Sequence, residues 1–268
     1  MAVRPGAILA SNPRFRSRRE SGAPWPGSGK ITPPDAIILA GGRGTRLAHL
    51  LPGLPKPLAP VAGKPFLFHL LDLLAGTGIQ RAVLSLGYEA RQIEDAIKTY
   101  HRLQLSCVTE RAALGTGGGL RQALAATQGE TLLALNGDSM TPFDLTGFLD
   151  FHQKGGWTVS LAAVAMEDCA RFGRLDLAGG GGVLSFLEKQ DSGAGIINAG
   201  IYLVKRSLLD SLPLGQPLSF ERDVLEPLTR QGKLGAFPCP GPFIDIGTPE
   251  SLAAAERLVP DIMDRIGS

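Results

Sequence analysis

The sequence has few cysteines and histidines, and neither residue type is spaced for disulfide pairing or metal binding. Cys107, Cys169 and Cys239 lie far apart without a CxxC pair, and an odd number does not fit a fully paired secreted framework. We therefore expect a reducing, cytoplasmic setting. The 4 histidines show no HExxH or similar ligand spacing, so the sequence predicts no zinc site.

Long apolar runs are missing as well. No run approaches the roughly 20 residues that a membrane-spanning helix needs, and the apolar stretch at 7–10 is too short for the apolar region of a signal peptide. We therefore expect no membrane partner. The chain also has no internal repeat of fixed period, and in particular no hexapeptide repeats, which argues against a solenoid domain.

Positive charge is concentrated in the first 34 residues. This segment holds six Lys or Arg against one acid, which leaves 21 basic and 24 acidic residues for the remainder. Its Pro, Gly, Ser and Arg content predicts a disordered extension at 1–34; a start codon assigned too early and a basic nucleic-acid-binding arm are the alternatives. Residues 35–268 then form one folded domain, whose slight acidity indicates no nucleic-acid partner.

The folded part alternates between short apolar β-rich runs and amphipathic helical stretches. Strands are predicted at 36–40, 82–87, 105–110 and 131–136, with helices between them near 65–75, 89–100 and 120–126. This order predicts an α/β fold, a Rossmann-like and mainly parallel sheet with helices on both faces.

The regular alternation of strands and helices ends after residue 151, where a small β-rich insertion is expected. Strands are predicted at 158–166 and 201–204, with a hairpin around the glycine turn at 179–182 and helices near 220–231 and 249–265.

A glycine-rich loop, G-G-R-G-T-R from Gly41 to Arg46, follows the first strand directly, and P-K-P around Lys56 comes next. Glycines let backbone N–H groups approach phosphate oxygens, while Arg46 and Lys56 add positive charge. The loop is not a Rossmann fingerprint, because Leu47 takes the place of the third glycine, and it is not a P-loop, because no GK[ST] follows. A plain glycine turn is the alternative interpretation.

Two further loops follow strands, the first at 110–119 and the second around Asp138. In open α/β sheets, ligands bind beyond the carboxyl ends of the strands, so the three loops should face one crevice. A solvated strand end is one interpretation of Glu110.

The combination L-A-G-G-x-G-T-R-L with P-K-P resembles the signature of sugar-1-phosphate nucleotidyltransferases, and the resemblance extends through most of 35–258. The order LNGDS, FLEK, INAGIYL and FIDIGTPE is most similar to the heptose 1-phosphate guanylyltransferases, with mannose-1-phosphate guanylyltransferases and uridylyltransferases as near relatives. The resemblance implies that GMP is transferred from GTP to a heptose- or mannose-type sugar 1-phosphate with release of pyrophosphate, in sugar-nucleotide supply for cell-surface polysaccharides.

Other readings remain open beside this one. They are a uridylyl- or thymidylyltransferase acting on another sugar 1-phosphate, a molybdopterin-type cofactor nucleotidyltransferase, and a catalytically silent homologue that binds nucleotide as a regulatory subunit. The oligomeric state does not follow from the sequence, and a homodimer is among the options.

The resemblance also implies residue roles. The segment at 110–119 looks like the family's base-recognition segment. Glu110 could there accept hydrogen bonds from both the N1–H and the N2–H₂ of guanine, whereas uracil offers one donor, which favours GTP and leaves UTP and dTTP open. Asp138 and Asp245 would bind Mg²⁺, whose preference for oxygen ligands they match. The implied catalytic set is Arg46, Lys56, Asp138, Lys189 and Asp245. The implied nucleotide-binding set is Leu39, Ala40, Gly41, Gly42, Gly44, Thr45, Arg46, Lys56, Glu110, Leu114, Gly115, Thr116, Gly117 and Asp138. The implied sugar-phosphate set is Gly137, Gly173, Glu188, Lys189 and Asn198. A surface ion pair is the alternative for Glu188 with Lys189, and a helix cap is the alternative for Asp245.

Overall fold

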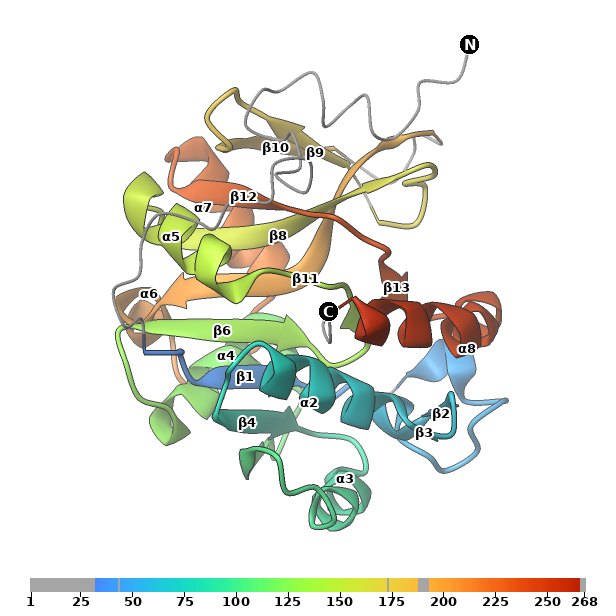
Figure 1. Ribbon diagram of the computed structural model, residues 1–268. Helices are drawn as coiled ribbons and strands as arrows, with labels where there is room; N and C mark the ends of the chain where they lie inside the picture. Colours follow the sequence, from blue (N-terminus) through green and yellow to red (C-terminus); the bar gives the residue numbers. More distant parts are fainter. Residues whose placement is uncertain (1–31, 43, 173, 188–192, 266–268) are drawn as a thin grey trace.

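The computed structural model describes residues 32–42, 44–172, 174–187 and 193–265. A seven-stranded sheet in the order β12-β8-β11-β6-β1-β4-β5 forms its centre (Figure 1). All of these strands run in one direction except β11, which is antiparallel to both of its neighbours. The strands are β1 (Ala36–Leu39), β4 (Arg81–Leu86), β5 (Gln104–Thr109), β6 (Thr131–Asn136), β8 (Val159–Met166), β11 (Gly195–Lys205) and β12 (Leu234–Cys239).

The sheet is covered on both faces because its inner strands are apolar at successive positions. In β1, Ile37 and Ile38 point to opposite faces, yet both are fully buried. Ile38 belongs to a hydrophobic cluster with α2, and Ile37 belongs to a second cluster with α4. The predicted α/β fold with a mainly parallel sheet is confirmed.

The helices divide between these two clusters. Those that share a cluster with Ile38 are α2 (Phe66–Gly76), α3 (Ala90–Ile97), α5 (Leu145–Gly155) and α8 (Pro249–Asp264). Those that share a cluster with Ile37 are α4 (Gly115–Ala123), α6 (Arg206–Ser211), the π-helical stretch η5 (Phe220–Leu225) and α7 (Glu226–Arg230). No helix of the described chain combines the length and the apolarity that a membrane span requires.

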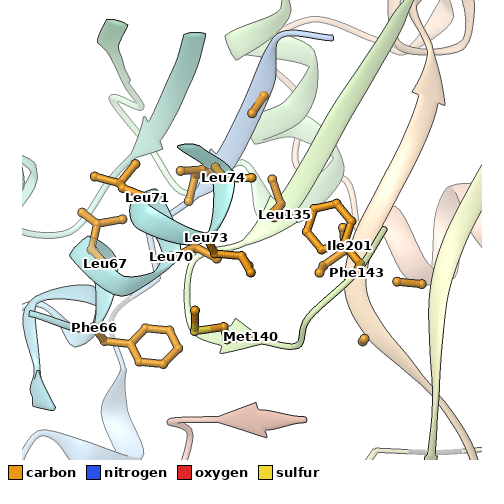
Figure 2. Close-up of a cluster of buried hydrophobic side chains, with 14 of the residues drawn as sticks. Phe66, Leu67, Leu70, Leu71, Leu73, Leu74, Leu135, Met140, Phe143 and Ile201 are labelled. Atoms are coloured by element: carbon orange, nitrogen blue, oxygen red, sulfur yellow. The ribbon is translucent and has the colours of Figure 1, made fainter. Parts of the chain in front are cut away.

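Helix α2 lies at the centre of the first cluster because it is apolar on nearly every side. Figure 2 shows its leucines beside Leu135 of β6 and Met140 of the short strand β7 (Ser139–Met140). The α2 side chains at 66, 67, 70, 71, 73 and 74 are all fully buried, as expected of a helix that is hydrophobic all round. This packing holds the turn between β6 and β7, which carries Asp138.

Three small antiparallel pairs complete the fold. β7 pairs with β13 (Ile244–Asp245), β2 (Pro60–Val61) pairs with β3 (Lys64–Pro65), and β9 (Arg174–Leu177) forms a hairpin with β10 (Val183–Leu187). The β9–β10 hairpin is the insertion that the sequence predicts around the glycine turn. An antiparallel bridge from Gly182 to Gly235 joins its turn to edge strand β12.

The structure differs from the predicted elements at several points. Helices α5 and α6, strand β12 and the short strands β2, β3, β7 and β13 were not predicted, β11 is longer than the predicted 201–204, and α4 begins before the predicted 120–126. The single helix expected near 220–231 is divided into η5 and α7, with Pro227 at the start of α7, where a missing N–H is tolerated. Residues 1–31 of the predicted N-terminal extension lie outside the described residues.

Candidate active site

The loops that follow β1, β5 and β6 line one cleft of about 500 Å³. These strands are parallel, so the cleft lies at the carboxyl edge of the sheet, where ligands bind in open α/β folds. The expectation that the three loops share a crevice is confirmed. The lining residues from these loops and their surroundings include Leu39, Ala40, Gly41, Gly42, Gly44, Thr45, Arg46, Lys56, Ser85, Glu110, Gly115, Thr116, Asn136, Gly137, Asp138 and Gly247.

The glycine loop is held against the end of β4 by a close backbone approach. A side-chain carbon at Gly87 would lie 2.8 Å from the carbonyl oxygen of Gly41, so neither position leaves room for a larger residue. The same carbonyl accepts a hydrogen bond from the backbone N–H of Tyr88 at 3.1 Å. Gly44 has a positive φ of 57° and begins the short turn η2 (Thr45–Leu47), which carries Arg46 into the cleft wall.

Lys56 reaches the cleft from the short turn η3 (Lys56–Leu58). Its side chain is 12% exposed, and its Nζ donates to Oδ2 of Asp138 at 2.6 Å. Gly44 packs directly on the Lys56 stem, since a side-chain carbon at Gly44 would lie 3.0 Å from Lys56 Cβ. The glycine loop, the P-K-P lysine and the N-G-D aspartate are thus in one assembly.

The two aspartates predicted as metal ligands lie close together in the fold, Asp138 in the turn before β7 and Asp245 on β13, which pairs with β7. Asp245 of β13 pairs in register with Ser139 of β7, and the N–H of Ile246 donates to the backbone oxygen of Asp138 at 2.9 Å. The Asp245 carboxylate accepts hydrogen bonds from Nη2 of Arg171 at 2.9 and 3.0 Å and from the N–H of Gly247 at 3.0 Å. Arg171 was not predicted from the sequence.

Glu110 is tied to the loop it begins and is not a freely solvated strand end. Its Oε2 accepts the N–H of Leu114 at 3.0 Å, and Oε1 accepts the hydroxyl of Ser85 at 3.4 Å. Gly119 of α4 leaves the necessary room, because a side-chain carbon there would lie 2.8 Å from Glu110 Oε1 and 2.9 Å from Ser85 Oγ. The carboxylate nevertheless lines the cleft.

The start of α4, with Leu114 just before it, is anchored from outside the cleft by residues 218–221. The Thr116 hydroxyl donates to Oε2 of Glu221 and accepts the N–H of Phe220, both at 2.8 Å. The N–H of Gly117 donates to the carbonyl of Leu218 at 2.8 Å. Leu114 and Gly117, both predicted to bind nucleotide, are therefore next to the cleft without lining it, and the Thr116 hydroxyl is committed to η5.

The predicted sugar-phosphate residues are only partly described. Asn198 lies on β11 at a register shift, where its Nδ2 donates to the hydroxyl of buried Tyr202 at 2.8 Å and its Oδ1 accepts the N–H of Gly200 at 3.0 Å. Burial raises the pKa of the Tyr202 phenol far above its usual range. Gly137 lines the cleft. Gly173, Glu188 and Lys189 lie outside the described residues.

Comparison with known proteins identifies the family of this chain. The model of the family described as nucleotidyl transferase matches residues 35–261. Mannose-1-phosphate guanylyltransferase of Mycobacterium tuberculosis is 37% identical over 221 residues, covering 81% of this chain and 62% of that protein. D-glycero-alpha-D-manno-heptose 1-phosphate guanylyltransferase of Aneurinibacillus thermoaerophilus is 34% identical over 224 residues, covering 83% of this chain and 97% of that protein.

A solved structure agrees in both fold and extent. The crystal structure of HddC from Yersinia pseudotuberculosis, complexed with GMP-PN, is similar with a TM-score of 0.74 and 33% identity, covering 83% of this chain and 98% of that chain. The sheet and its carboxyl-edge cleft define an α/β fold that this chain shares with that structure. The chain belongs to the nucleotidyl transferase family. It spans less than two thirds of the mycobacterial relative but nearly all of the heptose-specific one.

Proposed function

We propose that this protein is a sugar-1-phosphate guanylyltransferase, which transfers GMP from GTP to a heptose- or mannose-type sugar 1-phosphate and releases pyrophosphate. The observation that carries the proposal is the convergence of the glycine loop, Lys56, Asp138 and Glu110 on one cleft. The guanylyltransferase relatives support it, and the full-length match to the heptose enzyme favours a heptose substrate. The free cysteines, two of them buried, support a reducing cytoplasm as the site of the reaction.

The proposed reaction needs orientation and charge stabilisation more than acid–base chemistry. A phosphate oxygen of the sugar 1-phosphate attacks the α-phosphorus of GTP in line, and the bond from that phosphorus to the leaving pyrophosphate breaks. The attacking oxygen is already an anion, so no general base is required. Arg46, Lys56 and the amides of the glycine loop would bind the phosphates and hold them in line.

Magnesium is the proposed metal, and the donor chemistry of the described residues fits it. Asp138, in the turn before β7, and Asp245, on β13, offer carboxylate oxygens from paired segments, which suits an ion that usually takes one or two protein carboxylates and completes its shell with phosphates and water. Within the described ranges, no group of three or more His, Cys, Asp or Glu forms an all-protein site. When bound, the ion would offset charge on the α-phosphate and the leaving pyrophosphate.

Glu110 is the proposed reader of the base. Its carboxylate lines the cleft and is oriented by Ser85 and by the amide of Leu114. Each carboxylate oxygen can accept more than one hydrogen bond, so both can still accept N1–H and N2–H₂ of guanine. On the sugar side, Asn198 keeps a second N–H and a second lone pair to offer to a ring hydroxyl.

Pyrophosphate release with Mg²⁺ tests the proposal. GTP, UTP, dTTP, CTP and ATP are each combined with D-glycero-D-manno-heptose 1-phosphate, mannose 1-phosphate, glucose 1-phosphate and N-acetylated sugar phosphates. We expect release with GTP and the heptose or mannose phosphate. A preference for UTP or dTTP would keep the mechanism and overturn the base assignment, whereas no release with any pair would favour a silent nucleotide-binding homologue.

A further inference from the structure

Three charged side chains lie close to Gly247 at the edge of the cleft, and a fourth, Asp138, pairs with one of them. Arg171 contacts Asp245, and Lys56 contacts Asp138. A side-chain carbon placed at Gly247 would lie 2.5 Å from Asp245 Oδ2, 3.5 Å from Arg171 Nη2 and 3.6 Å from Lys56 Nζ. Two cations and the Asp245 carboxylate therefore lie around one residue that lines the cleft, and Lys56 links this group to Asp138.

Aromatic contacts hold Arg171 at this position. Its guanidinium lies over the ring of Phe172, 5.1 Å from the centroid, and Phe172 meets Phe243 edge to face at 5.3 Å. Phe243 directly precedes β13, which carries Asp245 and leads through Gly247 into α8 (Figure 1). The loop after β8 is thus packed against the segment that supplies the second aspartate. This packing holds Arg171 beside Asp245.

The geometry of the ion pair between Arg171 and Asp245 allows another cation to take the place of Arg171. One nitrogen, Nη2, donates to both carboxylate oxygens, so Arg171 does not use its two-nitrogen fork, and its side chain is 42% exposed. A divalent cation that binds Asp245 competes with this guanidinium, because both are attracted to the same two oxygens, one of which also accepts the N–H of Gly247. A phosphate entering the cleft gives the guanidinium an anion in return.

We propose that Arg171 is a positioning residue that acts as the counter-ion of Asp245 until a nucleotide enters, so that binding of the divalent cation is coupled to binding of the triphosphate. This inference rests on the proposed function, since it assumes that Asp245 is a metal ligand. Without nucleotide, the cation competes with Arg171 for Asp245. With nucleotide, the phosphates attract Arg171 and the competition is relieved.

The test is direct measurement of Mn²⁺ binding by electron paramagnetic resonance, with the full-length protein alone and with the α,β-methylene analogue of GTP, which does not react. Wild type should bind Mn²⁺ weakly alone and more tightly with the analogue. A partly exposed ion pair contributes only a small free energy, so its loss should change the competition for Asp245 only moderately. We therefore expect Arg171→Gln to tighten Mn²⁺ binding to the protein alone by about two- to fivefold. The Mn²⁺ affinity in the presence of the analogue should stay unchanged. The factor by which the analogue tightens Mn²⁺ binding should therefore fall, and the factor by which Mn²⁺ tightens binding of the analogue should fall equally.

Control variants separate this role from a general loss of charge. Arg102→Gln removes a comparable contact between an exposed arginine and Asp72 and should leave Mn²⁺ binding unchanged. Arg171→Lys keeps a cation and should bind Mn²⁺ within about twofold of wild type. Arg171→Met keeps an apolar side chain over Phe172. It serves as a second variant without the charge, in case glutamine disturbs the loop.

The outcomes are distinguishable. Unchanged or weaker Mn²⁺ binding by Arg171→Gln and Arg171→Met alone, with intact binding in the presence of the analogue, would overturn the counter-ion role and leave the proposed metal site standing. Absence of Mn²⁺ binding by wild type even with the analogue would overturn the metal site of the proposed function, and this inference with it.

Discussion

Replacing Gly119 by alanine tests whether the position of the Glu110 carboxylate decides which base binds. The added carbon would lie 2.8 Å from Glu110 Oε1 and 2.9 Å from Ser85 Oγ, well inside normal contact distance. Both atoms are at the ends of side chains, so the carboxylate can turn away at little cost to the fold. Alanine also favours the helix over glycine by roughly 0.5–1 kcal/mol, so overall stability should change little.

The expected effect is on guanine recognition. A hydrogen bond to a charged group contributes about 1.5–3 kcal/mol, and a displaced Glu110 loses such bonds to the base. This corresponds to a fall of about ten- to a hundredfold in kcat/KM for GTP. Inosine triphosphate lacks the 2-amino group and already forgoes one of these bonds, so the preference for GTP over inosine triphosphate should shrink.

The assay is steady-state pyrophosphate release at saturating sugar 1-phosphate, with thermal unfolding measured on the same preparations. Gly180→Ala is the matched control, because it adds the same carbon in a turn where nothing lies within 4 Å. A Gly119→Ala enzyme with wild-type kcat/KM for GTP and an unchanged preference over inosine triphosphate would refute the assignment of Glu110 as the base reader.

Four further changes test other parts of the structure. Asp138→Asn should lower turnover by orders of magnitude in the pyrophosphate assay and leave the melting temperature nearly unchanged; near-normal activity would refute a metal role. Gly247→Ala places a carbon 2.5 Å from Asp245 Oδ2 and should weaken Mn²⁺ binding and turnover together, and an effect on neither would contradict the placement of Asp245. Tyr202→Phe removes the acceptor of Asn198 Nδ2 in a buried setting and should cost about 1–3 kcal/mol of unfolding free energy in urea titrations. Burial lowers the pKa of His152 from 6.5 to about 4, so the unfolded chain binds the proton first and stability should fall between pH 6.5 and 4, by on the order of 3 kcal/mol; the corresponding loss should be smaller in His152→Gln.

The parts of the site that the sequence predicts are those with local signals. The glycine loop, Glu110 and Asp138 each follow a short strand of the parallel part of the sheet, and parallel strands bring their carboxyl ends to one edge. By contrast, Arg171 is 74 residues from Asp245, and Thr116 is 105 residues from Glu221. No periodicity or spacing connects such pairs, because their contact depends on how the loops fold over the sheet.

The fold elements that were not predicted have identifiable causes. Strand β12 contains Gly235 and Pro238, which argue against an interior strand, but β12 lies at the edge of the sheet, where a missing N–H is tolerated. Helix α5 does carry a start signal, since the Asp144 side chain accepts the N–H of Gly147 at 3.1 Å. The aspartate at 144 is thus the residue in the sequence that marks the start of α5.

The contact between Thr116 and η5 bears on attempts to change base specificity by grafting. The start of α4, which follows Glu110 along the chain, is held by Glu221, Phe220 and Leu218 from a segment about 100 residues further on. A transplanted loop without this segment would lose the partners that determine its shape. An exchange of nucleotide preference between two members of this family therefore has to move both segments together.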